Sequence, residues 1–298
     1  MALTTFVSTV TGAGSWVTPT GVWKIEYVEQ WGGGSGGGYV TVASGRAAGG
    51  PGGAYVRNSD FVTYPGSAFN FFVGSGGLGT SASSGATGRG GGDTWWLDVN
   101  SYLAKGATQG GTFSSTGLAS GIATNVAQSI GQVRFAGGAG GVANANQTAG
   151  GGGSAASSGG TGGSATNPTA GTATAGASAP GGGAGGAIGT AGTSDAKGGG
   201  GGGGALSGVG GAGGAPGGGG GGAVFPATAS GAGETGKIIV TYDADPTTTF
   251  RIEHLLLESI VSAPADVRVG QVGLEVLMSY GSGAAPAQRR RRSTTVVI

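Results

Sequence analysis

The sequence predicts an all-β protein: an antiparallel β-sandwich base, an inserted bundle of polyglycine helices, and a small C-terminal segment of β or irregular structure. Short alternating apolar segments fill the N-terminal part and are bounded by Gly, Pro, Asn or Ser. Glycine supplies 76 of the 298 residues, and its longest runs lie further along the chain. One more strand-like segment follows those runs. We therefore expect a sandwich over 1–136, a glycine-rich region over 137–233, a closing strand within 234–246 and a docking segment over 247–298.

The composition argues against several classes of protein. Charged residues make up 9% of the chain, its formal net charge is +1, and it has no cysteine, which excludes disulfides and cysteine-based zinc sites. The single histidine, His254, leaves no imidazole cluster, and a structural or exposed role is preferred for it. We expect no catalytic residue, no metal and no cofactor. We also expect no membrane insertion, because no stretch approaches the ~20 apolar residues of a spanning helix.

The predicted sandwich strands are short and fenced by turn residues. They cover residues 4–10, 15–17, 22–31, 53–57, 68–73, 94–97 and 102–104. The third alternates, so that Trp23, Ile25, Tyr27 and Trp31 share one face, whereas Lys24, Glu26 and Gln30 share the other. The strand at 237–242 would be isolated between loops, so we expect it to pair with the N-terminal sheet.

The glycine-rich region contains uninterrupted glycine runs at 150–153, 198–204 and 217–222, separated by turn-like breaks. A solvated flexible linker is one interpretation. The preferred one is a set of extended threefold helices with polyproline II geometry, packed side by side because glycine allows close backbone approach. A structureless loop of this length inside a compact domain is uncommon.

Several ordered motifs carry a resemblance to a known family. They are WVTPTGV at 16–22, WGGGSGGG at 31–38, PG at 65–66 before FVGSGG at 72–77, GGGDTW at 90–95 and GKIIVTY at 236–242. In this order they resemble the glycine-rich domain of bacteriophage tail fibres and adhesins, over about residues 4–243. The resemblance implies a β-sandwich base with a glycine-helix bundle and receptor contacts in loops at the bundle's tip. The segment 109–134 departs from the pattern, because it is rich in Ser, Thr and Val where glycine is expected.

The predicted receptor-binding residues lie in loops between glycine runs, at 142–148, 164–169, 190–197 and 223–228. These segments are small and nearly uncharged, and the predicted residues are the ones whose amide, ammonium or aromatic groups could contact a ligand: Asn146, Gln147, Asn167, Lys197 and Phe225. Such loops suit hydrogen bonding to a host surface glycan or an outer-membrane protein loop. Weak contacts would need several copies per particle, so we expect a homo-oligomer or a multi-copy protein.

The C-terminal segment is predicted to dock on the particle. Its run RVGQVGLEVL at 268–277 resembles a short motif of phage tail and virion proteins. The residues expected to dock are the apolar positions of this strand-like run and the following basic cluster: Val267, Val269, Val272, Leu274, Val276, Arg289, Arg290, Arg291 and Arg292. A solvated tail is the simpler interpretation of the four arginines, and nucleic-acid binding is not expected because no basic face continues upstream.

Together these features predict a non-enzymatic virion fibre or adhesin, exposed on the phage particle and bound to other virion proteins. The alternative is a purely structural head fibre or capsid decoration protein that recognises nothing. A glycan-cleaving tailspike would need paired carboxylates, for which Asp93 and Asp98 beside Trp95 are the candidates. Turn-forming roles for both are the preferred interpretation.

Overall fold

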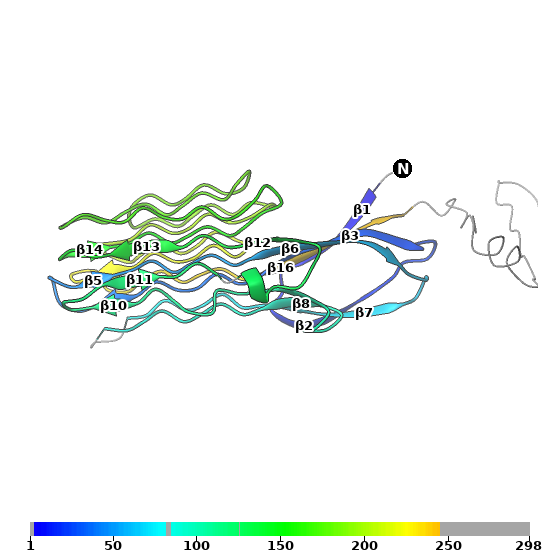
Figure 1. The fold of residues 1–298 in the computed structure, drawn as a ribbon, viewed down its shortest axis with the longest axis horizontal. Coiled ribbons are helices and arrows are strands. Elements are labelled where there is room, and N and C mark those ends of the chain that lie inside the picture. The colour runs from blue at the N-terminus through cyan, green and yellow to red at the C-terminus, as the bar shows by residue number, and fades with distance from the viewer. Residues whose placement is uncertain (1–2, 82–84, 125, 245–298) are drawn as a thin grey trace, which may run out of the picture. The chain divides into compact units, whose positions relative to one another are not determined.

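A computed structural model describes residues 3–81, 85–124 and 126–244. The fold is all-β, as predicted, and η1 (Val126–Gln128) is the only helix among these residues (Figure 1). The C-terminal segment 247–298, with His254, the apolar positions 267–276 and the four arginines, lies outside the described residues.

Two antiparallel sheets form one end of this part of the chain. In the first sheet, the order is β1 (Leu3–Ser8), β16 (Lys237–Asp243), β3 (Lys24–Trp31), β6 (Tyr55–Val62) and β12 (Val133–Phe135). In the second, it is β2 (Gly12–Val17), β7 (Ala68–Val73), β8 (Thr94–Trp96) and β9 (Tyr102–Ala104). The closing strand β16 pairs with β1 on one side and β3 on the other, which confirms that it returns to the N-terminal sheet.

The two sheets share an aromatic core. Trp16 and Trp96 of the second sheet lie 6.1 Å apart, and Trp16 also lies 5.4 Å from Tyr242 on β16. Ile25 and Val240 are fully buried in the same cluster. Burial of these large side chains supplies the main hydrophobic stabilisation of this end, at roughly 25 cal/mol per Å² of apolar surface.

The predicted alternation of β3 is wrong near its middle. Ile25 and Val28 both enter the aromatic core, and Gln30, expected on the solvent face, is 0% exposed. The register between β3 and β16 shifts by one residue beside Tyr27, and Asp60 on the neighbouring strand has a φ of 63°. A bulge of this kind reverses which side chains face the core, and sequence alternation alone does not reveal it.

From the sheets, the chain runs back and forth in extended segments that we call the glycine lattice. Its segments are 32–38, 48–54, 74–79, 86–92, 105–112, 136–143, 148–156, 161–166, 172–179, 183–187, 190–194, 198–205, 209–215, 217–224 and 229–236. They lie side by side along the long axis of Figure 1, and hydrogen bonds join neighbouring segments throughout.

The hydrogen bonds of the lattice repeat every three residues. In the segment 32–38, every third backbone N–H donates to the same neighbouring segment. The N–H groups of Gly32, Ser35 and Gly38 bond to segment 48–54, at the carbonyls of Ala54, Pro51 and Ala48 in that order. Those of Gly33 and Gly36 bond to Gly92 and Arg89 in segment 86–92, and those of Gly34 and Gly37 bond to Glu234 and Gly231 in segment 229–236. This segment thereby donates to three others, and its carbonyl oxygens accept from three more, 74–79, 105–112 and 217–224, so that it is bonded to six neighbours. A spacing of three residues equals the repeat of the polyproline II helix, which stays a prediction for these segments.

Glycine is required because the segments approach so closely. A Cβ on Gly201 would lie 2.0 Å from the carbonyl oxygen of Gly152, and one on Gly37 would lie 2.2 Å from that of Gly221. Backbone atoms cannot move aside as the end of a side chain can. Interior positions at which a Cβ would meet backbone in this way are therefore closed to other residue types, whereas Ser35, Ala155 and Ala205 occupy other buried positions of the lattice.

Short strands tie the lattice together at the end away from the two sheets. Five of them form small ladders there: β4 (Tyr39–Val40) with β15 (Ala223–Val224), and β5 (Arg46–Ala47) with β10 (Phe113–Ser114) and β14 (Thr148–Ala149). β11 (Ala119–Gly121) pairs with β13 (Gly140–Ala143). A small apolar cluster that includes Val40, Ala47 and Val224 lies among them.

The lattice draws on more of the chain than the predicted region 137–233. Segments 32–38, 48–54, 74–79, 86–92 and 105–112 belong to the predicted sandwich range, yet they are hydrogen-bonded within the same network. Each continues a sheet strand or leads into one, so the lattice and the sheets share segments of chain rather than meeting at one boundary.

Substitution of one interior glycine tests the lattice. We expect Gly201→Ala to lower the free energy of unfolding by about 3 kcal/mol or more, because the added methyl would overlap fixed backbone. Exposed Gly117 is the matched control, since a Cβ there would meet only the Ser114 hydroxyl at 3.1 Å. Denaturant unfolding of the variants checks this, and equal stabilities for Gly201→Ala and Gly117→Ala would contradict the close packing.

Candidate functional site

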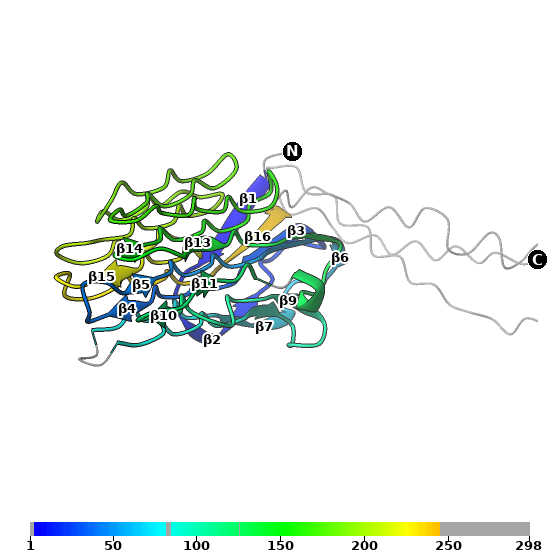
Figure 2. The same ribbon diagram turned by 60° about the vertical axis from the view of Figure 1, so that its left-hand side comes forward.

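The tip surface, as we call it, comprises the turns at the end of the lattice away from the two sheets. These turns are 41–45, 115–118, 144–147, 167–171, 188–190, 206–208 and 225–228. Figure 2 brings this end, marked by β4, β5, β14 and β15, toward the viewer. Most of the turn residues are exposed, whereas the segments behind them are largely buried.

Arg46 joins two turns of the tip surface. Its guanidinium donates to the carbonyl oxygens of Thr116 and Gly117, the latter at 2.8 Å, and to Asn146 Oδ1 at 2.8 Å. Within the tip turns and the residues that flank them, Arg46 is the only ionisable side chain the structure describes. Arg46 does not stand out in the sequence, because a lone arginine between small residues carries no periodic signal.

Four of the five predicted receptor-binding residues lie on the tip surface. Asn146 and Gln147 occupy one exposed turn, where Gln147 has a φ of 56°. Asn167 Oδ1 accepts a hydrogen bond of 2.9 Å from the N–H of Val142, which fixes a neighbouring turn. Phe225 is 49% exposed. The fold thus gathers side chains that are separated by up to 79 positions (225 − 146 = 79) in the sequence.

The fifth residue, Lys197, lies at the opposite end of the lattice. Its carbonyl oxygen accepts a hydrogen bond of 3.1 Å from Trp31 Nε1, at the end of β3. The predicted loop 190–197 is in fact a lattice segment, 190–194, followed by a turn beside the sheets. Because a lattice segment is only a few residues long, the sequence did not distinguish a segment plus a turn from one loop.

The chemistry of the tip surface is apolar and hydrogen-bonding. Val42, Ile188 and Phe225 are 42%, 58% and 49% exposed. A hollow of about 460 Å³ opens between the turns around Thr172, Ile188 and Leu206. Such a surface offers apolar contact and backbone or hydroxyl groups to a ligand, with the positive charge of Arg46 held in hydrogen bonds within the tip.

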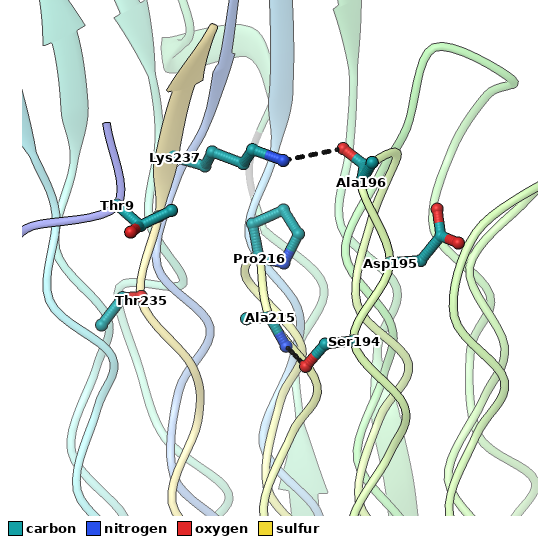
Figure 3. Close-up of a pocket in the computed structure, with 9 residues that line it drawn as sticks. Thr9, Ser194, Asp195, Ala196, Ala215, Pro216, Thr235 and Lys237 are labelled. Atoms are coloured by element: carbon teal, nitrogen blue, oxygen red, sulfur yellow. Dashed lines mark hydrogen bonds between the residues drawn. The ribbon is translucent and has the colours of Figure 1, made fainter. Parts of the chain in front are cut away.

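A second hollow, of about 400 Å³, lies at the sheet end of the lattice (Figure 3). Lys237 Nζ donates a hydrogen bond of 3.2 Å to Ala196 O and lies 5.6 Å from the ring centroid of Trp31. Burial lowers the pKa of Lys237, opposed by the negative charges of Glu29 and Asp195. From the sequence, Lys237 is expected only as the first residue of the strand at 237–242.

The two carboxylates considered for glycan cleavage are engaged in local structure. Asp93 accepts from Lys105 Nζ at 2.6 Å and from the N–H of Gly106 at 2.9 Å. Asp98 accepts from the Ser101 hydroxyl and the N–H of Asn100, which lowers the pKa of this exposed carboxyl. Asp98 therefore holds the turn between β8 and β9, as expected, whereas Asp93 links the residue before β8 to the residues that follow β9.

Residues 3–81, 85–124 and 126–244 contain no group of three or more His, Cys, Asp or Glu side chains placed to hold a metal ion. In the same ranges no helix has the length and apolar character needed to cross a membrane.

Loss of the Arg46 bridge is expected to loosen the tip without unfolding the protein. In Arg46→Ala, amide exchange in the turns 115–118 and 144–147 should quicken by about tenfold, the scale of a lost charge-assisted hydrogen bond. The free energy of global unfolding should change by less than about 1 kcal/mol. Exposed Arg89→Ala serves as control, and unchanged exchange in both turns of Arg46→Ala would refute the bridging role.

Comparison with models of protein families identifies the family of this chain. No curated protein matches the chain. The glycine-rich domain family matches residues 8–243, which covers the whole glycine lattice and every sheet strand except β1, of which only Ser8 is included. The chain therefore belongs to the glycine-rich domain family.

Proposed function

We propose that this protein is a non-enzymatic adhesin on a bacteriophage particle, and that its tip surface binds a molecule of the host cell surface. The observation that carries the proposal is the collection of exposed turns from distant parts of the chain at one end of the lattice. Binding residues are disproportionately found on loops held by a rigid scaffold. The resemblance of the ordered motifs to phage tail fibres and adhesins supports the viral assignment.

The composition of the tip surface narrows the expected ligand. Exposed Phe225 and Ile188 provide apolar contact, and Asn146, Gln147 and Thr190 provide hydrogen-bonding groups. Little charge is available for binding an anionic polymer. An outer-membrane protein loop or a neutral surface glycan fits this chemistry better than nucleic acid does.

We expect the contacts of one tip surface to give modest affinity. Weak contacts gain useful strength when several copies act together on one particle. We therefore propose that the protein is present in multiple copies and is attached to other virion proteins, with the docking segment 247–298 as the proposed attachment.

Cell binding with matched variants at the two ends of the lattice tests the proposal. The full chain, carrying a fluorescent label, is applied to a panel of Gram-negative strains. Phe225→Ser and Gln147→Ala at the tip surface should each reduce binding to responsive strains by about tenfold, the size of a modest contact-residue effect. Lys197→Ala, an exposed substitution at the opposite end, should bind like the parent protein.

Electron microscopy of labelled virions provides the second readout. Label on fibre tips, together with the loss of binding in the tip variants, supports the adhesin. Label on the capsid shell with no cell binding by the full chain would replace the adhesin with a structural head fibre or decoration protein. Equal binding by tip and control variants would remove the tip surface as the receptor site.

A further inference from the structure

The hollow at the sheet end of the lattice has features of a binding site of its own. It lies between the start of β16 and two lattice turns, and Thr9, Thr235 and Lys237 line one side. Ser194, Ala196 and Pro216 line the other side (Figure 3). Its volume of about 400 Å³ falls within the range of small-molecule sites, roughly 300–1,000 Å³.

The cation of this hollow lacks a direct anionic partner. Lys237 Nζ makes one hydrogen bond, to the neutral carbonyl of Ala196, and no ion pair in the described ranges includes it. The carboxylate of Asp195 points away from Lys237 (Figure 3), and its Oδ1 accepts from the N–H of Lys197 at 2.9 Å. An ammonium has three donors, so two remain for a ligand.

The surroundings of Lys237 favour an oxyanion as that ligand. The side chain is half-buried, and desolvation of an ammonium group is costly unless an opposite charge accompanies it. Burial lowers the pKa of Lys237 even though Glu29 and Asp195 act in the opposite direction. A bound carboxylate would supply both the missing charge and two strong acceptors.

The remaining groups of the hollow suit a sugar. Thr9 and Thr235 line the hollow together with Lys237, and a threonine hydroxyl can donate as well as accept. Ser194 Oγ accepts from the N–H of Ala215 at 2.9 Å, which leaves its own proton available. The ring of Pro216 lies below the Lys237 side chain and gives an apolar surface on which a pyranose can rest.

We propose that this hollow binds a carboxylate-bearing sugar unit, with the carboxylate on Lys237 Nζ and the ring against Pro216. The ligand class is the uronic acid type of acidic monosaccharide, as found within surface polysaccharides. This site is separate from the tip surface and does not depend on the function proposed for the tip. It would give the protein a second contact, to an acidic glycan, beside the sheets.

Titration of the full chain with small sugars tests the proposal. In two-dimensional NMR spectra, glucuronate should shift the amide signals of Thr9, Thr235 and Lys237 saturably. Glucose, which has the same ring without the carboxylate, should bind at least about tenfold more weakly. Acetate and inorganic phosphate, which are anions without the sugar ring, should also bind at least about tenfold more weakly.

Two lysines at this end of the lattice form the matched pair. Lys237→Gln should raise the dissociation constant for glucuronate by about tenfold or more. Lys197→Gln, in the adjoining turn but outside the hollow, should change it less than about twofold. Tryptophan fluorescence shows that each variant is folded, and Thr235→Val provides a second variant of the hollow should Lys237→Gln not fold.

The outcomes that overturn the proposal are equally specific. Equal affinity for glucose and glucuronate would remove the carboxylate contact. Phosphate or acetate binding as tightly as glucuronate would make the hollow a plain anion site. Absence of saturable shifts, or unchanged glucuronate affinity in Lys237→Gln and Thr235→Val, would remove the site altogether.

Discussion

The close approach of one backbone to another is the constraint on which the rest of this structure depends. Across the glycine lattice, the carbonyl oxygen of one segment lies too close to the facing glycine to leave room for a Cβ. For example, a Cβ on Gly201 would lie 2.0 Å from the carbonyl oxygen of Gly152. This spacing lets one segment donate hydrogen bonds to three neighbours and accept them from three others, as the segment 32–38 does. It also confines the interior mainly to glycine and to small residues such as Ser35 and Ala155. All larger side chains must therefore sit in the sheets, in the turns or on the outer segments.

Such a lattice must be anchored, because glycine loses more backbone freedom on ordering than any other residue. The sheets provide the anchor. β3 runs directly into the segment 32–38, β6 and β16 follow lattice segments, and the aromatic core between the sheets fixes all three strands. Trp31 at the end of β3 also holds two further lattice segments, 148–156 and 198–205. Its indole N–H donates to the carbonyl of Ala156 in the first and to that of Lys197 just before the second. The lattice is thus held at its sheet end by packing and at its tip by the short ladders and the Arg46 bridge.

Features that depend on local residue pattern could be predicted from the sequence, whereas features that depend on which segments become neighbours could not. The strands could be predicted closely, because 68–73 and 102–104 are apolar segments bounded by turn residues, and the structure has β7 and β9 at these residues. The pairing of β16 with the N-terminal sheet could also be predicted, because a strand isolated between loops would have no partner. The bulge beside Tyr27 and the position of Lys197 could not be predicted, since both depend on which segments become neighbours. Asn146 and Phe225 were found as candidates because polar and aromatic residues stand out in a glycine-rich background, whereas Arg46 and Lys237 acquire their roles only through contacts with distant turns.

The lattice also separates the two ends chemically. The tip turns are nearly uncharged, while Lys237, Asp195 and Lys197 gather with Glu29 at the sheet end. A turn residue at one end is joined to the other end through glycine segments, which pack against each other by backbone contacts. We therefore expect substitutions in the tip turns to leave the charged hollow unchanged, as long as they spare the Arg46 bridge and the bond of Asn167 to Val142. A protein built in this way can change what one end binds without losing stability or altering the other end, which a domain with a shared side-chain core cannot easily do.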